Sequence, residues 1–140
     1  RGLQDQCARV ALDRGYIRTI AGRRCRFDHW EHRFEDSVPL PLEEAKEKYG
    51  DNLKRSYTYK ALNRLIQGSA ADMTKLAMLG LWEEGIVPHL QVHDEVDISI
   101  ENTDQARKVA RIMENCIELA VPLVVDIELG RSWGETEELT

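Results

Sequence analysis

The sequence predicts an α+β fold in which antiparallel strands pack on one face of a set of helices. Helical periodicity recurs over residues 3–14, 59–84 and 102–120, which predicts the main helices. Two-residue alternation over 16–27 and 96–100 predicts strands beside tight turns. Because hairpins and helices alternate along the chain, neighbouring strands are expected to run antiparallel.

The N-terminal part of the chain predicts a helix followed by a basic hairpin. Residues 3–14 place apolar side chains at helical spacing, and Gly15 follows as a C-terminal stop. The hairpin at 16–27 has Ala and Gly at its turn, and its alternation is expected to carry Tyr16 and the arginines to opposite faces. Residues 14–26 hold five arginines and no acid, which fits a solvated face or a phosphate-contacting surface.

Residues 28–58 are expected to form a polar insertion or linker outside the core. The segment contains two prolines, and a single short helix is predicted over 42–50, ended by Gly50. Its ring side chains are interpreted as ordinary loop packing, because no second pair of metal ligands accompanies them. These side chains are His29, Trp30 and His32.

The helix predicted at 59–84 has two distinct faces. With successive residues about 100° apart, one face is apolar and is expected to lie in the core. Its members are Leu62, Leu65, Ile66, Ala70, Met73, Leu76, Ala77 and Gly80. Asn63, Gln67 and Thr74 share another face, which is either simply solvated or able to reach base-edge acceptors in a minor groove. Four small residues at 68–71 would let a partner's backbone or a groove edge approach closely.

The stretch LQVHDEVDIS, residues 90–99, places His93, Asp94 and Glu95 between two apolar flanks. Taken alone, it fits a surface turn between two strands. Because residues 96–100 alternate apolar and polar side chains, the acid cluster is expected at a hairpin tip or just inside a strand edge.

The C-terminal part predicts one more helix and one more strand. Residues 102–120 form a capped amphipathic pattern, and residues 121–130, VPLVVDIELG, predict the last strand. The longest apolar runs are too short and too interrupted to cross a bilayer, so no membrane partner is expected.

Composition and charge limit the function classes. The net charge is −6, but residues 1–60 carry 13 Lys and Arg against 10 Asp and Glu, whereas 61–140 carry 6 against 15. One part could therefore hold a polyanion and another part metal ions. Because the chain opens on Arg1 in mid-pattern, it is expected to be a piece of a larger protein. Three widely spaced cysteines are expected to be reduced thiols: Cys7, Cys25 and Cys116.

Four segments resemble, in order, motifs of the family A DNA polymerases, the DNA polymerase I type. GYIRTIAGRRCRF at 15–27 resembles the segment leaving the fingers, and NRLIQGSAADMTKLAM at 63–78 resembles the helix before the third palm motif. VHDEV at 92–96 resembles that motif itself, and VPLVVDIELGRSWGE at 121–135 resembles the C-terminal palm strand. The resemblance covers most of the chain except residues 28–58.

This resemblance implies an antiparallel palm-type sheet packed on helices, within a larger right-hand polymerase fold. Residues 1–27 would be the end of a fingers helix and the basic hairpin, 28–58 the insertion, and 59–140 the C-terminal palm segment. The implied activity is template-directed DNA synthesis, with primer-template DNA and deoxynucleoside triphosphates as partners. A cytoplasmic location in a bacterial or phage-infected cell is expected.

The resemblance also implies roles for individual residues. Asp94 would be a ligand in a two-Mg²⁺ site and Glu95 a secondary catalytic acid, while His93 would contact the backbone at the primer 3′ end. Asn63 and Gln67 would contact the duplex minor groove. The family's other metal-binding aspartate and its nucleotide-binding fingers helix are absent from these residues. The remainder of the polymerase chain is therefore an expected partner, and this chain alone is expected to be inactive.

One position departs from the bacterial pattern. Tyr59 stands where bacterial members carry an arginine, and Lys60 is the candidate substitute for the primer contact. Arg23 and Arg24 are predicted to contact DNA phosphates. The KALN sequence that begins at Lys60 favours a phage member of the family.

Two alternatives stay open. The chain could be a non-catalytic DNA-binding or assembly subunit of a split polymerase. It could also be a metal-dependent nuclease or hydrolase using Asp94, Glu95 and Asp97, which would require one more convergent carboxylate. The strand candidates for that role, Asp126 and Glu128, are better explained by solvent-facing alternation.

Overall fold

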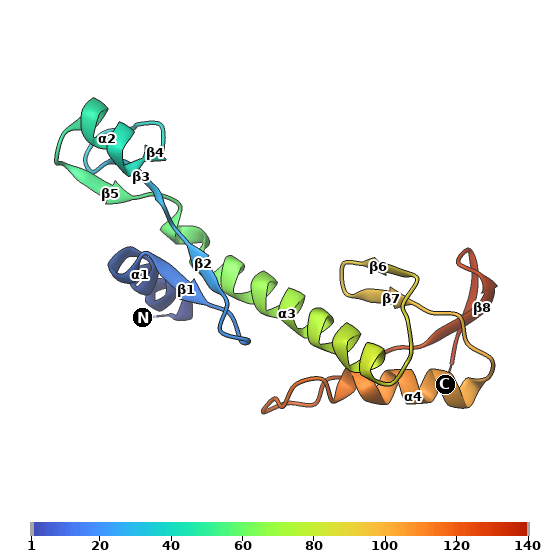
Figure 1. Ribbon diagram of the computed structural model, residues 1–140. Coiled ribbons are helices and arrows are strands. Elements are labelled where there is room, and N and C mark those ends of the chain that lie inside the picture. Colours follow the sequence, from blue (N-terminus) through green and yellow to red (C-terminus); the bar gives the residue numbers. More distant parts are fainter. Residues whose placement is uncertain (1, 140) are drawn as a thin grey trace. The chain divides into compact units, whose positions relative to one another are not determined.

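The computed structural model describes residues 2–139 and divides the chain into two compact units. Unit 1 is Arg1–Ser69 and unit 2 is Ala70–Thr140, so the division falls inside one long helix, α3, Ala61–Glu83. Figure 1 labels most of the helices and strands of both units. The α+β class is confirmed: the strands of the described residues form four small antiparallel sheets, rather than one continuous palm-type sheet.

Unit 1 begins as predicted, with a helix and a hairpin. Helix α1 is Leu3–Arg14, and Gly15 ends it in the left-handed region at φ 76°, where its N–H donates to the Ala11 carbonyl at 2.9 Å. Strands β1, Tyr16–Arg18, and β2, Arg24–Arg26, pair antiparallel. The core of this unit joins α1, the hairpin and the start of α3. Its buried members are Cys7, Ala11, Ile17, Phe27 and Ala61.

Residues 28–58 are more ordered than an insertion with a single helix. Helix α2, Leu42–Tyr49, is confirmed, and Gly50 follows it. The segment also forms a three-stranded antiparallel sheet in the order β4-β3-β5. Its strands are β3, His29–His32, β4, Leu40–Pro41, and β5, Leu53–Arg55. The strands escaped prediction because each has two to four residues, too few for a period of two to stand out.

A short 3₁₀ helix, Thr58–Lys60, leads into α3. The predicted apolar face of α3 is confirmed in part. Leu62 and Leu65 pack against the core of unit 1, and Ala77 is buried in unit 2. Ile66 is 57% exposed and Ala70 is also exposed, so the assignment of these two residues to the core was wrong. Ile66 lies one residue from Gln67, at the border of the polar face.

Unit 2 contains two hairpins and one further helix. Strands β6, Leu90–Val92, and β7, Glu95–Asp97, form the first hairpin, and β8, Glu128–Ser132, and β9, Glu135–Glu138, form the second. Helix α4 is Thr103–Glu114.

Helix α4 begins where the sequence predicted and ends earlier. The Asn102 side chain accepts a hydrogen bond from the Gln105 N–H at 3.0 Å, an N-cap. At the other end, the Asn115 side chain donates to the Arg111 carbonyl at 2.7 Å. This bond satisfies a carbonyl of the last turn, as a C-terminal cap does. The helix ends at Glu114, so the predicted continuation to residue 120 was wrong.

The last predicted strand is displaced towards the C-terminus. Residues 121–127 are not in a strand, and pairing begins at Glu128. A β-strand needs a hydrogen-bonded neighbour. Residues 135–138 provide one for β8, whereas Pro122 lacks an N–H to donate.

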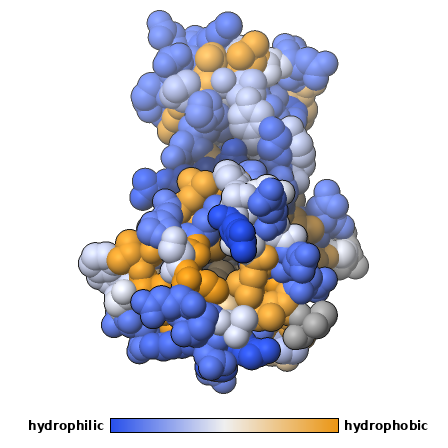
Figure 2. Space-filling model, turned by 90° about the vertical axis from the view of Figure 1, so that its right-hand side faces the viewer, coloured by the Kyte–Doolittle hydropathy of each residue, from blue (hydrophilic) through white to orange (hydrophobic). Residues whose placement is uncertain are grey.

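Apolar side chains remain exposed in unit 2. Large ones with more than half of their surface exposed include Leu79, Trp82, Val87, Val121, Val124 and Trp133. Figure 2 shows hydrophobic surface interspersed with hydrophilic side chains. Within residues 2–139, no helix has the length and apolar character that crossing a membrane requires.

Candidate functional site

The first candidate surface lies at the N-terminal end of α3. Lys60, Asn63 and Gln67 follow one another at intervals of three and four residues, which places them on one side of a helix. All three are exposed. The neighbouring Arg64 is used within the fold, because its guanidinium donates to the Arg26 carbonyl at 3.1 Å and lies 4.6 Å from the Phe27 ring centre. The predicted polar stripe is therefore present and accessible at Asn63 and Gln67.

The turn of the arginine hairpin docks on the next residues of α3. The Arg23 side chain donates to the Gly68 carbonyl at 2.9 Å, and the Ile20 N–H donates to Ser69 Oγ at 3.1 Å. A Cβ added at Gly68 would lie only 2.7 Å from Thr19 Cγ2. The small residues of α3 therefore make room for the chain's own hairpin. The sequence analysis expected a partner's backbone or a groove edge to approach at these residues.

Thr19 makes the turn itself rigid. Its N–H donates to the Arg23 carbonyl at 2.9 Å, and its hydroxyl accepts from the Arg23 N–H at 3.1 Å. Gly22, at φ 82°, supplies the left-handed residue of this turn. The position of Arg23 is therefore set by both the turn and α3.

The two faces of this hairpin correct one expectation. Arg18 and Arg24 lie over the Tyr16 ring, at 5.8 and 4.8 Å from its centre, so the tyrosine and these arginines share a face. Residues two apart on a strand point the same way, as do residues directly paired across it. Ile17 and its partner Cys25 occupy the other face, towards the core. Arg24 is exposed and presents a cation backed by an aromatic ring.

The second candidate surface is the turn between β6 and β7 in unit 2. Val92 pairs with Glu95, which leaves His93 and Asp94 as the two turn residues, and His93, Asp94 and Glu95 are all exposed. This confirms the predicted hairpin tip. His93 has φ 54°, a left-handed conformation that costs about 1–2 kcal/mol for a residue with a side chain. The Gln91 side chain donates to the His93 carbonyl and supports this turn.

The donor chemistry at this turn fits part of a magnesium site. An exposed carboxylate such as Asp94 is the hard oxygen ligand that Mg²⁺ takes. Among residues 2–139, however, no group of three or more His, Cys, Asp or Glu side chains is arranged to hold a metal. Asp94, Glu95 and Asp97 therefore do not form the self-contained site that the hydrolase alternative requires.

Sequence reasoning found the residues at both surfaces but missed what holds the first one. The hydrogen bonds to Gly68 and Ser69 join positions 45 and 49 residues apart. Adjacent small residues were a signal of close approach, although they did not identify the approaching element. Tyr57, which has φ 61°, was also missed, because only the folded backbone reveals such a conformation.

Comparisons with known proteins extend this description. The sequence model of a family described as DNA polymerase family A matches residues 1–135. A DNA-directed DNA polymerase of Pseudomonas phage M6 is 40% identical over 134 residues, which are 96% of this chain and 17% of that protein. DNA polymerase theta of Drosophila melanogaster is 32% identical over 160 residues, which span 100% of this chain and 7% of that protein.

One solved structure is also similar. It is the POL domain of Pol1 from M. smegmatis in complex with DNA primer-template and dNTP. The TM-score is 0.58 at 29% sequence identity, and the match covers 86% of this chain and 20% of the other. This chain therefore spans a fifth or less of the length of each of these three proteins.

Proposed function

The chain belongs to DNA polymerase family A, and on this premise we propose that it supplies the C-terminal palm segment for template-directed DNA synthesis. The observation that carries the proposal is the β6–β7 turn, which presents Asp94 and Glu95 in exposed positions. Phosphoryl transfer needs carboxylates held where metal ions and the reacting phosphate can reach them. A hairpin tip with a fixed two-residue turn meets that need.

In this proposal Asp94 is a ligand of the catalytic magnesium ions, and Glu95 is a secondary acid beside them. When bound, the magnesium ions would stabilise charge on the attacking and leaving oxygens. A further carboxylate would come from an aspartate outside these 140 residues. His93, at the same turn, would position the backbone of the primer's 3′ end.

The surface on unit 1 would bind the primer-template duplex. Asn63 and Gln67 can donate to minor-groove acceptors, whose pattern is nearly independent of sequence, as a polymerase requires. Arg23, Arg24 and Lys60 would contact phosphates. The exposed apolar surface of unit 2 supports a further partner, namely the remainder of a polymerase, which would also supply most of the deoxynucleotide site.

Primer extension tests the proposal in a polymerase that carries these residues as its palm segment. We expect Asp94→Asn to lower the single-turnover rate by about two to four orders of magnitude, because metal clamping contributes several kcal/mol and about 1.4 kcal/mol is tenfold. Glu95→Gln should cost less, and His93→Ala should mainly weaken primer binding. The 140-residue chain alone should extend no primer.

Asp126→Asn is a matched control, because it removes the same charge at another exposed position of unit 2. It should extend at the parent rate. An Asp94→Asn enzyme that also extends at the parent rate would overturn the catalytic proposal and favour a non-catalytic DNA-binding or assembly subunit.

A further inference from the structure

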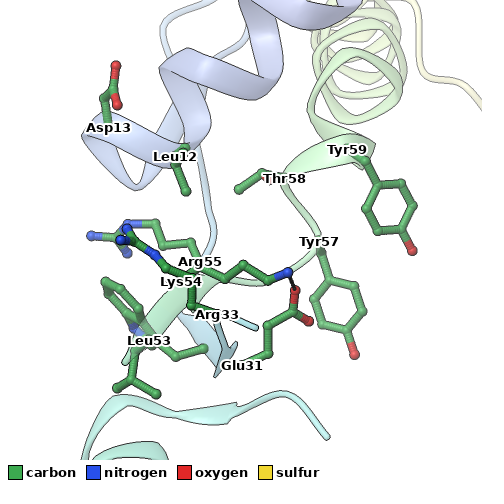
Figure 3. A pocket seen from close by; sticks show the side chains of 11 residues that line it. Leu12, Asp13, Glu31, Arg33, Leu53, Lys54, Arg55, Tyr57, Thr58 and Tyr59 are labelled. Carbon is green, nitrogen blue, oxygen red and sulfur yellow. Dashed lines mark ion pairs between the residues drawn. The ribbon is translucent and has the colours of Figure 1, made fainter. Parts of the chain in front are cut away.

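Unit 1 contains a cavity of about 590 Å³ that the proposed function does not use. Figure 3 shows it between the C-terminal end of α1, the sheet of the 28–58 segment and residues 57–59. Its volume lies in the range of small-ligand sites, roughly 300–1,000 Å³. Most of the lining comes from residues 30–59, so the cavity exists because the 28–58 segment is folded.

Aromatic rings form much of the cavity wall. Trp30, Tyr57 and Tyr59 all line it, and Tyr59 is 64% exposed. Figure 3 shows Tyr57 and Tyr59 on one side and Arg55 with Asp13 on the other. Tyr57 has a left-handed backbone at φ 61°. Such strained residues persist where the surrounding structure fixes them, and they cluster at ligand sites.

Cations outnumber carboxylates among the residues that line the cavity: the cations are Arg33, Lys54 and Arg55, and the carboxylates are Asp13 and Glu31. Lys54 and Glu31 form an ion pair at 3.3 Å.

The two arginines differ in what they contact. Arg55 donates to the Phe27 carbonyl at 3.0 Å and stacks on Trp30 at 4.4 Å. The Arg33 side chain is exposed and, within residues 2–139, has no ion-pair or hydrogen-bond partner. Arg33 is therefore the cation of this cavity that is available to an anionic ligand.

We propose that this cavity binds single-stranded nucleic acid, with a base stacked on Tyr59 and a phosphate at Arg33. Aromatic faces beside cations are how proteins hold unpaired strands without reading their sequence. A duplex keeps its base faces stacked internally and cannot use such a wall. The inference rests on the proposed function in one respect, the choice of nucleic acid as the class of ligand. It does not require the chain to be catalytic.

Fluorescence anisotropy of a labelled oligothymidylate of eight nucleotides tests the proposal on the 140-residue chain. Tyr59→Ala should weaken binding at least about fivefold, since stacking one base contributes about 1–3 kcal/mol, whereas Tyr59→Phe should bind like the parent. Arg33→Ala should reduce the slope of log affinity against log salt by about 0.7, the value for one phosphate contact on a single strand.

Lys46→Ala is the matched control for Arg33, because Lys46 is an exposed cation of the same segment, on α2 and outside the cavity. It should leave the salt slope unchanged. Circular dichroism should confirm that each variant keeps the parent's fold.

Three outcomes would overturn the inference: equal affinity of Tyr59→Ala and the parent, equal slopes for Arg33→Ala and Lys46→Ala, or competition by thymidine monophosphate at the oligonucleotide's own affinity. The last would indicate a mononucleotide site. The test is separate from the proposed function because it measures binding by the 140-residue chain without magnesium or deoxynucleotides, so failure of the catalytic proposal would leave its expected results unchanged.

Discussion

Helix α3 meets a neighbouring element at a glycine in each of the two units, and the two contacts differ in kind. In unit 1 the hairpin turn reaches Gly68, where an added Cβ would lie 2.7 Å from Thr19 Cγ2, and hydrogen bonds fix the approach. In unit 2 Gly80 faces helix α4, where an added Cβ would lie 3.1 Å from Ile112 Cγ2. The first contact is polar and directional, and the second is apolar.

This difference matches what each contact has to position. Hydrogen bonds depend on angle as well as distance, so the contact at Gly68 sets the orientation of the hairpin that carries the arginines. Apolar contact is non-directional, and a helix pair can adjust by a few tenths of an ångström. We therefore expect substitution at Gly68 to have the larger effect.

The sharpest test of the comparison is Gly68→Ala. We expect it to destabilise the chain by up to about 2 kcal/mol, because overpacking costs about 1–3 kcal/mol while alanine gains about 1 kcal/mol over glycine in a helix. Thr19 cannot easily move aside, since its hydroxyl is bonded within the turn. Urea unfolding measures the loss. Hydrogen exchange at the Ile20 N–H, which donates to Ser69, should become faster.

Gly80→Ala is the matched control on the same helix. The half-buried Ile112 side chain can shift to admit one methyl group, so the helix propensity of alanine should offset the contact. Stability should stay within about 1 kcal/mol of the parent. Equal losses of stability in Gly68→Ala and Gly80→Ala would contradict the distinction between a directional polar contact and an adjustable apolar one.

A smaller effect is expected from the side chains that these contacts position. Replacing Arg24, which is exposed over Tyr16, by alanine should reduce the salt slope of duplex binding by about 0.9, the value for one phosphate contact. Gln67→Ala should weaken binding with little change of slope, because an amide releases no counterion. Titrations at several salt concentrations measure both. Equal changes of slope would refute the separation of phosphate and groove contacts.

The polar stripe and the acid turn could be predicted because each is local in sequence. Asn63 and Gln67 share a face by helical geometry alone, and the alternation after Glu95 points to a hairpin whose tip holds His93 and Asp94. The class of fold follows from the same periodicities.

What could not be predicted depends on contacts distant in sequence. The strand containing Trp30 is paired through residues 40 and 55, and its few residues leave too weak a pattern. The docking of Arg23 on Gly68 joins two motifs that had been assigned separately. The apolar run at 121–127 resembles a strand, but pairing begins only at Glu128, where a partner exists.

The smallest effect is expected at the C-terminal end of α3, where Glu84 and Lys108 of α4 form an exposed ion pair at 2.7 Å. The hydrogen bond and charge of Lys108 lower the pKa of Glu84 from its ordinary value of 4.5. A lowered folded-state pKa means that the pair stabilises above pH 4.5 and loses this contribution as pH falls through the lowered value. Solvent screens an exposed pair, so Glu84→Gln should change the melting temperature only slightly at about pH 7 and not at all well below pH 4.5. If the melting temperatures of Glu84→Gln and the parent still differed in acid, Glu84 would act through something other than its charge. If they differed greatly at neutral pH, the contact between α3 and α4 would depend on this ion pair more than on Gly80.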